Sequence, residues 1–174
     1  MDHTPRLIGT AIHKILQIIS EKGFSFWSNR SEDEKNCYLN ALLKQLGVGV
    51  EQSECAVSTV LKAIQNTLTD ERGRWILHSH QDAKSEYALT AMMDDGVVNL
   101  VIDRTFIDSH HTRWIIDYKT TALSQEDLDH FLVKEQKKYA EQMSNYSQVF
   151  RASHDGAIRH GLYFPVIPAW YEWD

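Results

Sequence analysis

Apolar residues recur three and four positions apart through the first part of the chain, which is the spacing of one helix face. This pattern predicts three helices, over residues 9–22, 31–46 and 52–68. Gly23 is a typical stop signal for the first helix. Ser31 and Glu34 form the capping-box pattern at the start of the second helix. We therefore expect a helical N-terminal region.

Alternating apolar and polar residues replace the helical spacing in the middle of the chain. They predict three strands, over residues 86–92, 97–108 and 112–118. An Asp-Asp-Gly step at residues 94–96 lies between the first two strands, and such a step between apolar runs is a strong hairpin signal. His110 and His111 are interpreted as residues of the next turn.

Helical spacing returns after Ser124 and predicts one long helix from about Gln125 to Arg151. A last strand is expected over residues 157–164, followed by a tail that contains two prolines. This order of helices, three strands, a helix and a strand indicates an α/β or α+β fold. We expect a single domain, with a helical lead-in over residues 1–70 and a core over residues 71–174.

The composition fits a globular domain, with 174 residues of which 43% are apolar and 24% are charged. No apolar run approaches the roughly 20 residues that span a membrane, and residues 1–6 do not resemble a secretion signal. Cys37 and Cys55 are too few for a four-thiolate zinc site or an iron–sulfur cluster, so a cytoplasmic location is expected. The net charge of −6 argues against a surface that coats nucleic acid, but it is compatible with an enzyme that touches a few phosphates.

Two aspartates end apolar runs on neighbouring predicted strands. If the hairpin is centred on His110, Asp103 lies opposite Asp117 and both carboxylates face the same side, whereas a one-residue slip would separate them. In a strand, Asp117 and Lys119 would also point to the same face, about 6–7 Å apart. The sequence therefore predicts a cluster of Asp103, Asp117 and Lys119.

Two carboxylates this close repel each other by about 4 kcal/mol at ~4 Å and an effective dielectric constant near 20. They need a proton, a neighbouring base or a cation. Lys119 could neutralise one of them, and a salt bridge of this kind with a purely structural role is one interpretation. A divalent cation would neutralise both, and oxygen ligands suit Mg²⁺ or Mn²⁺.

The motifs follow one another in an order that resembles the PD-(D/E)xK nucleases and, more narrowly, the nuclease domain of RecB- and AddA-type helicase–exonucleases. The matching segments are Gly9-Thr10-Ala11-Ile12-His13, Glu86, Ile102-Asp103-Arg104, Ile115-Ile116-Asp117-Tyr118-Lys119-Thr120, and the helical series Tyr139, Gln142 and Tyr146. This resemblance implies a restriction-endonuclease-like core, in which helices flank a central mixed sheet.

The resemblance also implies roles for these residues. The implied metal ligands are His13, Asp103, Asp117 and the backbone carbonyl of Tyr118. Glu86 would contact metal or water, Lys119 would stabilise charge on the phosphate, and Gln142 with Tyr146 would hold the DNA strand. Phosphate contacts are expected by residue type alone at Arg104, Arg113 and Arg151.

The implied activity is metal-dependent hydrolysis of DNA at ends or in single strands, as an exonuclease or endonuclease. Mg²⁺ is the expected cofactor, with Mn²⁺ as a substitute and no iron–sulfur cluster. RecB- and AddA-type chains carry a helicase with a GxxxxGK[ST] phosphate-binding loop, and this loop does not occur here. The chain is therefore either a stand-alone nuclease or, as we expect, the nuclease part of a larger bacterial helicase–nuclease. That enzyme would act in double-strand break repair by recombination, with or without a partner subunit, and it would not need a membrane.

Two alternatives stay open. The first is a catalytically silent module of the same fold that binds DNA or docks on a helicase. The second is a zinc hydrolase, because His78, His80 and Asp82 form the start of an H-x-H-x-D pattern. In that pattern a histidine follows the aspartate, whereas Ala83 follows here, so the segment is interpreted as a polar loop.

Overall fold

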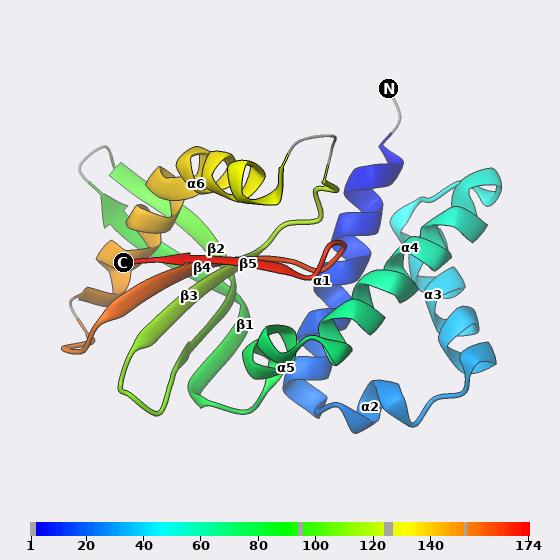
Figure 1. Cartoon of the computed structure of the whole chain (residues 1–174), viewed down its shortest axis with the longest axis horizontal. Helices are drawn as coiled ribbons and strands as arrows, with labels where there is room; N and C mark the ends of the chain where they lie inside the picture. The colour runs from blue at the N-terminus through cyan, green and yellow to red at the C-terminus, as the bar shows by residue number, and fades with distance from the viewer. Residues whose placement is uncertain (1–2, 94–95, 124–126, 152) are drawn as a thin grey trace. The chain divides into compact units, whose positions relative to one another are not determined.

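The computed structural model describes residues 3–93, 96–123, 127–151 and 153–174, which form two compact units (Figure 1). The helical unit consists of Met1–His78, Lys119–Ala122 and Phe164–Pro168. The sheet unit consists of Ser79–Tyr118, Leu123–Tyr163 and Ala169–Asp174. The expectation of a single domain stays a prediction.

The helical unit begins with α1, which ends where Gly23 adopts a positive φ of 85°. The Ser31–Glu34 capping box forms at the start of α3 and confirms that signal. The helices are α1 (Thr4–Lys22), α2 (Ser25–Ser28), α3 (Glu32–Leu46), α4 (Val50–Thr69) and α5 (Glu71–Leu77). The three helices expected from the sequence are therefore confirmed, while the two short ones, α2 and α5, were not predicted.

Apolar stripes on α1, α3 and α4 pack against one another and form the core of the helical unit. Ile12, Ile15 and Ile19 of α1 are fully buried, as the spacing of the stripe requires. Within the described residues, no helix has both the length and the apolar character needed to cross a membrane.

In the sheet unit, the described residues form a mixed five-stranded sheet in the order β1-β2-β3-β4-β5. Strand β2 is antiparallel to both β1 and β3, whereas β4 runs parallel to β3. The elements are β1 (Gln81–Met93), β2 (Gly96–Ile107), β3 (Arg113–Tyr118), α6 (Leu128–Arg151), β4 (Ile158–Phe164) and β5 (Ala169–Trp173). This mixed sheet with helices confirms an α/β fold consistent with the restriction-endonuclease type.

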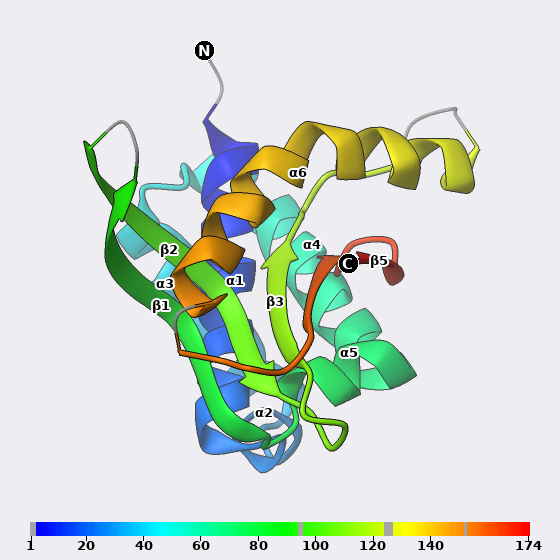
Figure 2. The same cartoon turned by 90° about the vertical axis from the view of Figure 1, so that its left-hand side faces the viewer.

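Helix α6 connects β3 to β4, as a parallel pair requires, and packs on the sheet (Figure 2). Met143, Tyr146 and Phe150 of α6 form one hydrophobic cluster with Ile102 of β2 and Ile115 of β3. Each fully buried side chain of this size contributes about 1.5–3 kcal/mol. The cluster therefore fixes α6 against the strands that carry the two aspartates.

The structure differs from the sequence-based expectation at several boundaries. Strand β5 occupies the segment that was expected to be a tail, because the two prolines fall in the turn between β4 and β5. Strand β1 begins earlier than predicted, and positive φ angles at Asp82 and Glu86 interrupt its alternation. The predicted helix start at Gln125 and the turn residues Asp94 and Asp95 lie outside the described residues.

A glycine on β4 makes room for an aromatic side chain of β5. A Cβ atom added at Gly161 would collide with the indole ring of Trp170. We expect Gly161→Ala to lower the free energy of unfolding by about 1–3 kcal/mol, because overpacking forces side chains out of their preferred rotamers. Chemical denaturation measures the change.

Val97→Ala is the control for this prediction, since Val97 is 63% exposed on β2. Exposed substitutions of this kind change stability by no more than about 0.5 kcal/mol. Equal stability of the two variants would contradict the packing role assigned to Gly161.

Candidate active site

Three acidic residues lie level with one another on neighbouring strands of the sheet unit. The residues on either side of Glu86 pair with those on either side of Asp103, which places these two acids opposite each other. The β2–β3 register is centred on residue 110, which is the condition under which the two aspartates were expected to meet, and its continuation by one residue sets Asp103 opposite Asp117. One row across β1, β2 and β3 therefore carries all three acids.

The first two acids of this row are close in space as well as in register. Ligand oxygens of Glu86 and Asp103 lie within 4.8 Å of each other. Glu86 has a φ of 46°, a left-handed conformation that is uncommon for residues other than glycine. Backbone strain of this kind clusters at functional sites, and here it occurs at a residue that faces another carboxylate.

The Asp103 carboxylate is oriented by the backbone of the next strand. The amide N–H of Tyr118 donates a hydrogen bond of 2.7 Å to Asp103 Oδ2. Burial raises the pKa of the Tyr118 hydroxyl far above its usual value, the nearby Arg104 charge lowers it, and the charges of Asp103 and Glu86 raise it further. The phenol therefore stays protonated at neutral pH, within the field of both carboxylates.

Helix α6 reaches Asp117 through a short chain of hydrogen bonds. Gln142 Nε2 lies 3.5 Å from Asp117 Oδ1 and donates a 2.6 Å hydrogen bond to the hydroxyl of Tyr146. That hydroxyl in turn donates to the carbonyl of Val101 at 2.9 Å. Burial raises the pKa of Tyr146, the hydrogen bond from Gln142 lowers it, and the charges of Asp117 and Asp103 raise it again.

The set of donors fits a divalent cation. Asp117 is only 6% exposed, and a buried carboxylate near other carboxylates is costly unless a counter-charge compensates it. All three side chains present carboxylate oxygens, the ligand type preferred by hard cations such as Mg²⁺ and Mn²⁺. Glu86 and Asp103 could therefore hold such an ion, and Asp117 lies next to Asp103 in the same row.

Two other predicted site residues, His13 and Lys119, belong to the helical unit. His13 lies half-buried on α1, and Lys119 follows Tyr118 directly beyond the end of β3. The structure thus brings together the three acids, Gln142 and Tyr146 in the sheet unit, while the metal and phosphate roles of His13 and Lys119 stay predictions.

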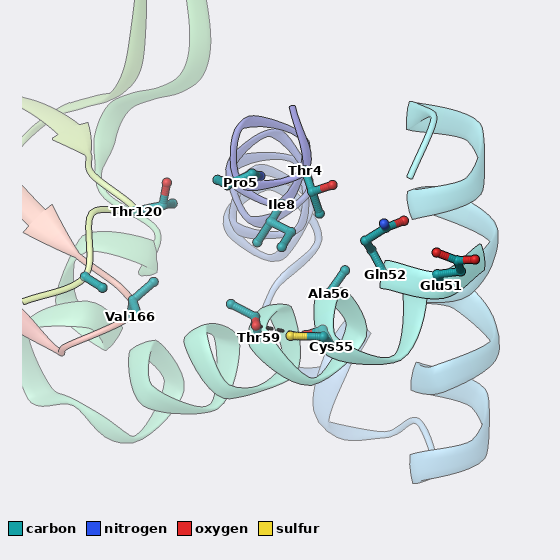
Figure 3. Close-up of a pocket in the computed structure, with 11 residues that line it drawn as sticks. Thr4, Pro5, Ile8, Glu51, Gln52, Cys55, Ala56, Thr59, Thr120 and Val166 are labelled. Atoms are coloured by element: carbon teal, nitrogen blue, oxygen red, sulfur yellow. Dashed lines mark hydrogen bonds between the residues drawn. The ribbon is translucent and has the colours of Figure 1, made fainter. Parts of the chain in front are cut away.

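The glycine of the Gly-x-x-x-His motif has a packing role within the helical unit. A Cβ atom added at Gly9 would lie 2.9 Å from Thr120 Oγ1, closer than ordinary contacts allow. The missing side chain lets the segment that follows Lys119 approach α1. A cavity of about 430 Å³ opens beside it (Figure 3), and its lining includes Ile8, Ala56, Thr120 and Val166.

Two of the three arginines expected to contact phosphate are buried, which makes that interpretation wrong for both of them. Arg104 is 2% exposed and donates to Ser85 Oγ at 3.1 Å. Arg113 is 5% exposed and forms an ion pair of 2.6 Å with Asp82. Residue type does not reveal burial, which is why the sequence was misleading here. Arg151, at the end of α6, is exposed.

Two residues of the H-x-H-x-D pattern, His80 and Asp82, have structural partners within the sheet unit. The ring of His80 stacks flat on Phe106, with centroids 4.0 Å apart and an interplanar angle of 9°. The carboxylate of Asp82 binds Arg113 and Lys84. These contacts account for His80 and Asp82 without a zinc ion.

A comparison with known families identifies the superfamily of the chain. The family model described as the PD-(D/E)XK nuclease superfamily matches residues 2–171, and the chain therefore belongs to that superfamily. Its members are generally nucleases that use divalent metal ions. Among curated proteins, none matches the chain.

The hydroxyl of Tyr146 links α6 to β2 and supports Gln142, so its removal should loosen both contacts. We expect Tyr146→Phe to cost about 1 kcal/mol, the usual net value of such a hydrogen bond. For a chain of this size the midpoint of thermal unfolding would fall by about 2–4 °C. Differential scanning calorimetry measures it.

Tyr171→Phe is the matched control, because Tyr171 lies on β5 and outside this chain of hydrogen bonds. If both variants unfold at the same temperature as the parent protein, the hydrogen bonds of Tyr146 contribute nothing to the sheet unit.

Proposed function

We propose that this protein is a metal-dependent deoxyribonuclease, which hydrolyses phosphodiester bonds at the row formed by Glu86, Asp103 and Asp117. The observation that carries the proposal is this row of carboxylates on neighbouring strands in a chain of the PD-(D/E)XK superfamily. A buried carboxylate in such a row would be stabilised by a cation, and phosphodiester hydrolysis uses the same cation.

The ion would be held by Asp103 and Asp117, together with His13 and the backbone carbonyl of Tyr118, and Glu86 would bind the ion or its water. Mg²⁺ is the proposed ion, with Mn²⁺ as a substitute. When bound, a divalent ion lowers the pKa of a water ligand and polarises the phosphate.

The remaining site residues act through charge and position. Lys119 would stabilise the negative charge that grows on the phosphate during cleavage. Gln142 would orient Asp117, because its amide is the α6 group that reaches Asp117 Oδ1. Tyr146 would keep Gln142 in that orientation by accepting its second N–H.

The narrower proposal is a nuclease domain of the RecB or AddA type, which works with a helicase in double-strand break repair by recombination. The ordered motifs from Gly9 to Tyr146 support it. On this proposal the substrate is a DNA end or a single strand that a helicase supplies. The reaction would take place in the cytoplasm of a bacterium, with or without a partner subunit.

The test is cleavage of end-labelled single-stranded and double-stranded DNA in Mg²⁺, Mn²⁺ or EDTA. We expect cleavage with either metal and none with EDTA. Asp117→Ala should reduce the rate at least about 100-fold, and so should Lys119→Ala, because each removes a charge that acts at the reacting phosphate. Lys137→Ala, on the exposed surface of α6, is the control and should retain full activity.

Equal residual cleavage by the parent protein and both variants would contradict the proposed centre. The same cleavage assay would then be repeated on the protein together with its helicase. It would distinguish a nuclease that needs the helicase to supply DNA from a catalytically silent module that docks on the helicase. Retention of activity in the Asp117→Ala protein within that assembly would overturn the proposal.

A further inference from the structure

Two histidines and an aspartate gather where β3 and β4 begin, apart from the row of carboxylates. His111 lies in the β2–β3 turn, and His154 and Asp155 lie in the segment between α6 and β4. One ligand atom from each lies within 4.8 Å of the other two. His111 Nε2 and Asp155 Oδ1 are 3.1 Å apart, and the centroids of the two imidazole rings are 5.0 Å apart.

Backbone hydrogen bonds hold the two segments in place. The amide of Arg113 donates to the carbonyl of Ala157 at 2.8 Å, which ties the start of β3 to the residue before β4. The amide of His154 donates to the carbonyl of Phe150 at 2.9 Å, and that of His111 to Asp108 at 3.1 Å. The three side chains therefore project from anchored backbone.

Gly156 allows these segments to come together. A Cβ atom added there would collide with the carbonyl oxygen of His111 and lie 2.7 Å from His154 Nε2. Any larger residue would push the two histidines apart. The absence of a side chain at this position thus brings His154 Nε2 close to the turn that carries His111.

A simple ion pair does not explain this cluster. It accounts for His111 and Asp155, whose side chains are 60% and 97% exposed. His154 is only 9% exposed, and its Nε2 is buried without a hydrogen-bond partner among the described residues. Buried polar atoms are nearly always paired, so this nitrogen calls for a ligand that is shared with its two neighbours.

We propose that His111, His154 and Asp155 bind a divalent transition-metal ion, for which Zn²⁺ is the best chemical match. Two imidazole nitrogens and one carboxylate oxygen are typical ligands of Zn²⁺, whereas Mg²⁺ prefers oxygen alone. Tetrahedral Zn²⁺ with ligands at about 2.0–2.1 Å needs ligand atoms roughly 3.3 Å apart, so small side-chain rotations complete the site. Water would occupy the fourth position.

This site and the row of carboxylates select different ions. The carboxylates offer hard oxygen ligands, and the histidine cluster offers mainly nitrogen. Bound Zn²⁺ would link the β2–β3 turn to the entrance of β4, and would stabilise the sheet unit against unfolding. Neither consequence depends on nuclease activity.

The test is calorimetric titration of the metal-stripped full chain with Zn²⁺ in millimolar Mg²⁺, which keeps the carboxylates supplied with their own ion. We expect one Zn²⁺ per chain and a higher midpoint of thermal unfolding. His111→Asn should weaken Zn²⁺ binding by at least about tenfold. Removing a group that only orients a metal ligand already lowers metal affinity by that much. Asparagine tolerates the φ of 61° at this position.

His110→Asn is the matched control, because His110 is the preceding exposed residue of the same turn and is not a member of the cluster. His154→Gln should also weaken Zn²⁺ binding. Circular dichroism would check that the His154→Gln protein is folded. Equal Zn²⁺ affinity of the His110→Asn and His111→Asn proteins would overturn the proposal. So would loss of Zn²⁺ binding in Asp117→Ala with retention in His111→Asn, because the ion would then lie at the carboxylates.

Discussion

Three carboxylates lie level with one another on neighbouring strands, and the sheet unit has to hold their negative charges together. The antiparallel registers of β1, β2 and β3 set Glu86, Asp103 and Asp117 in one row. Their repulsion favours separation, whereas the strand hydrogen bonds and the buried cluster under α6 favour this arrangement. A shift of one residue in either register would break up the row, because it would turn alternate side chains to the other face.

The neighbouring groups reduce the cost of this arrangement and orient each acid differently. The Tyr118 amide gives Asp103 a short hydrogen bond from the adjacent strand. Asp117 is reached by Gln142, which depends on the hydroxyl of Tyr146 and therefore on the packing of α6. Neutral donors thus orient two of the acids, and the folded strands supply most of the geometry of the row.

The sequence predicted much of the sheet, because helical and alternating periods indicate element type. The observed β2–β3 register is the one centred on His110, which the sequence offered only as a condition for bringing the two aspartates together. It did not predict β5, since two prolines concealed the turn that precedes it. It also misassigned Arg104 and Arg113, because burial depends on tertiary packing. The cluster of His111 and His154 was out of reach for the same reason, as the parallel pairing of β3 with β4 brings distant segments together.

We propose that Asp103 and Asp117 share a divalent metal ion. Anomalous diffraction from crystals soaked in Mn²⁺ tests it most directly, because the ion is located without reference to activity. We predict an anomalous peak about 2.0–2.3 Å from oxygens of both aspartates, with Glu86 at the ion or its water. A Mn²⁺ peak at the histidine cluster alone, or none near either aspartate at saturating metal, would contradict the account.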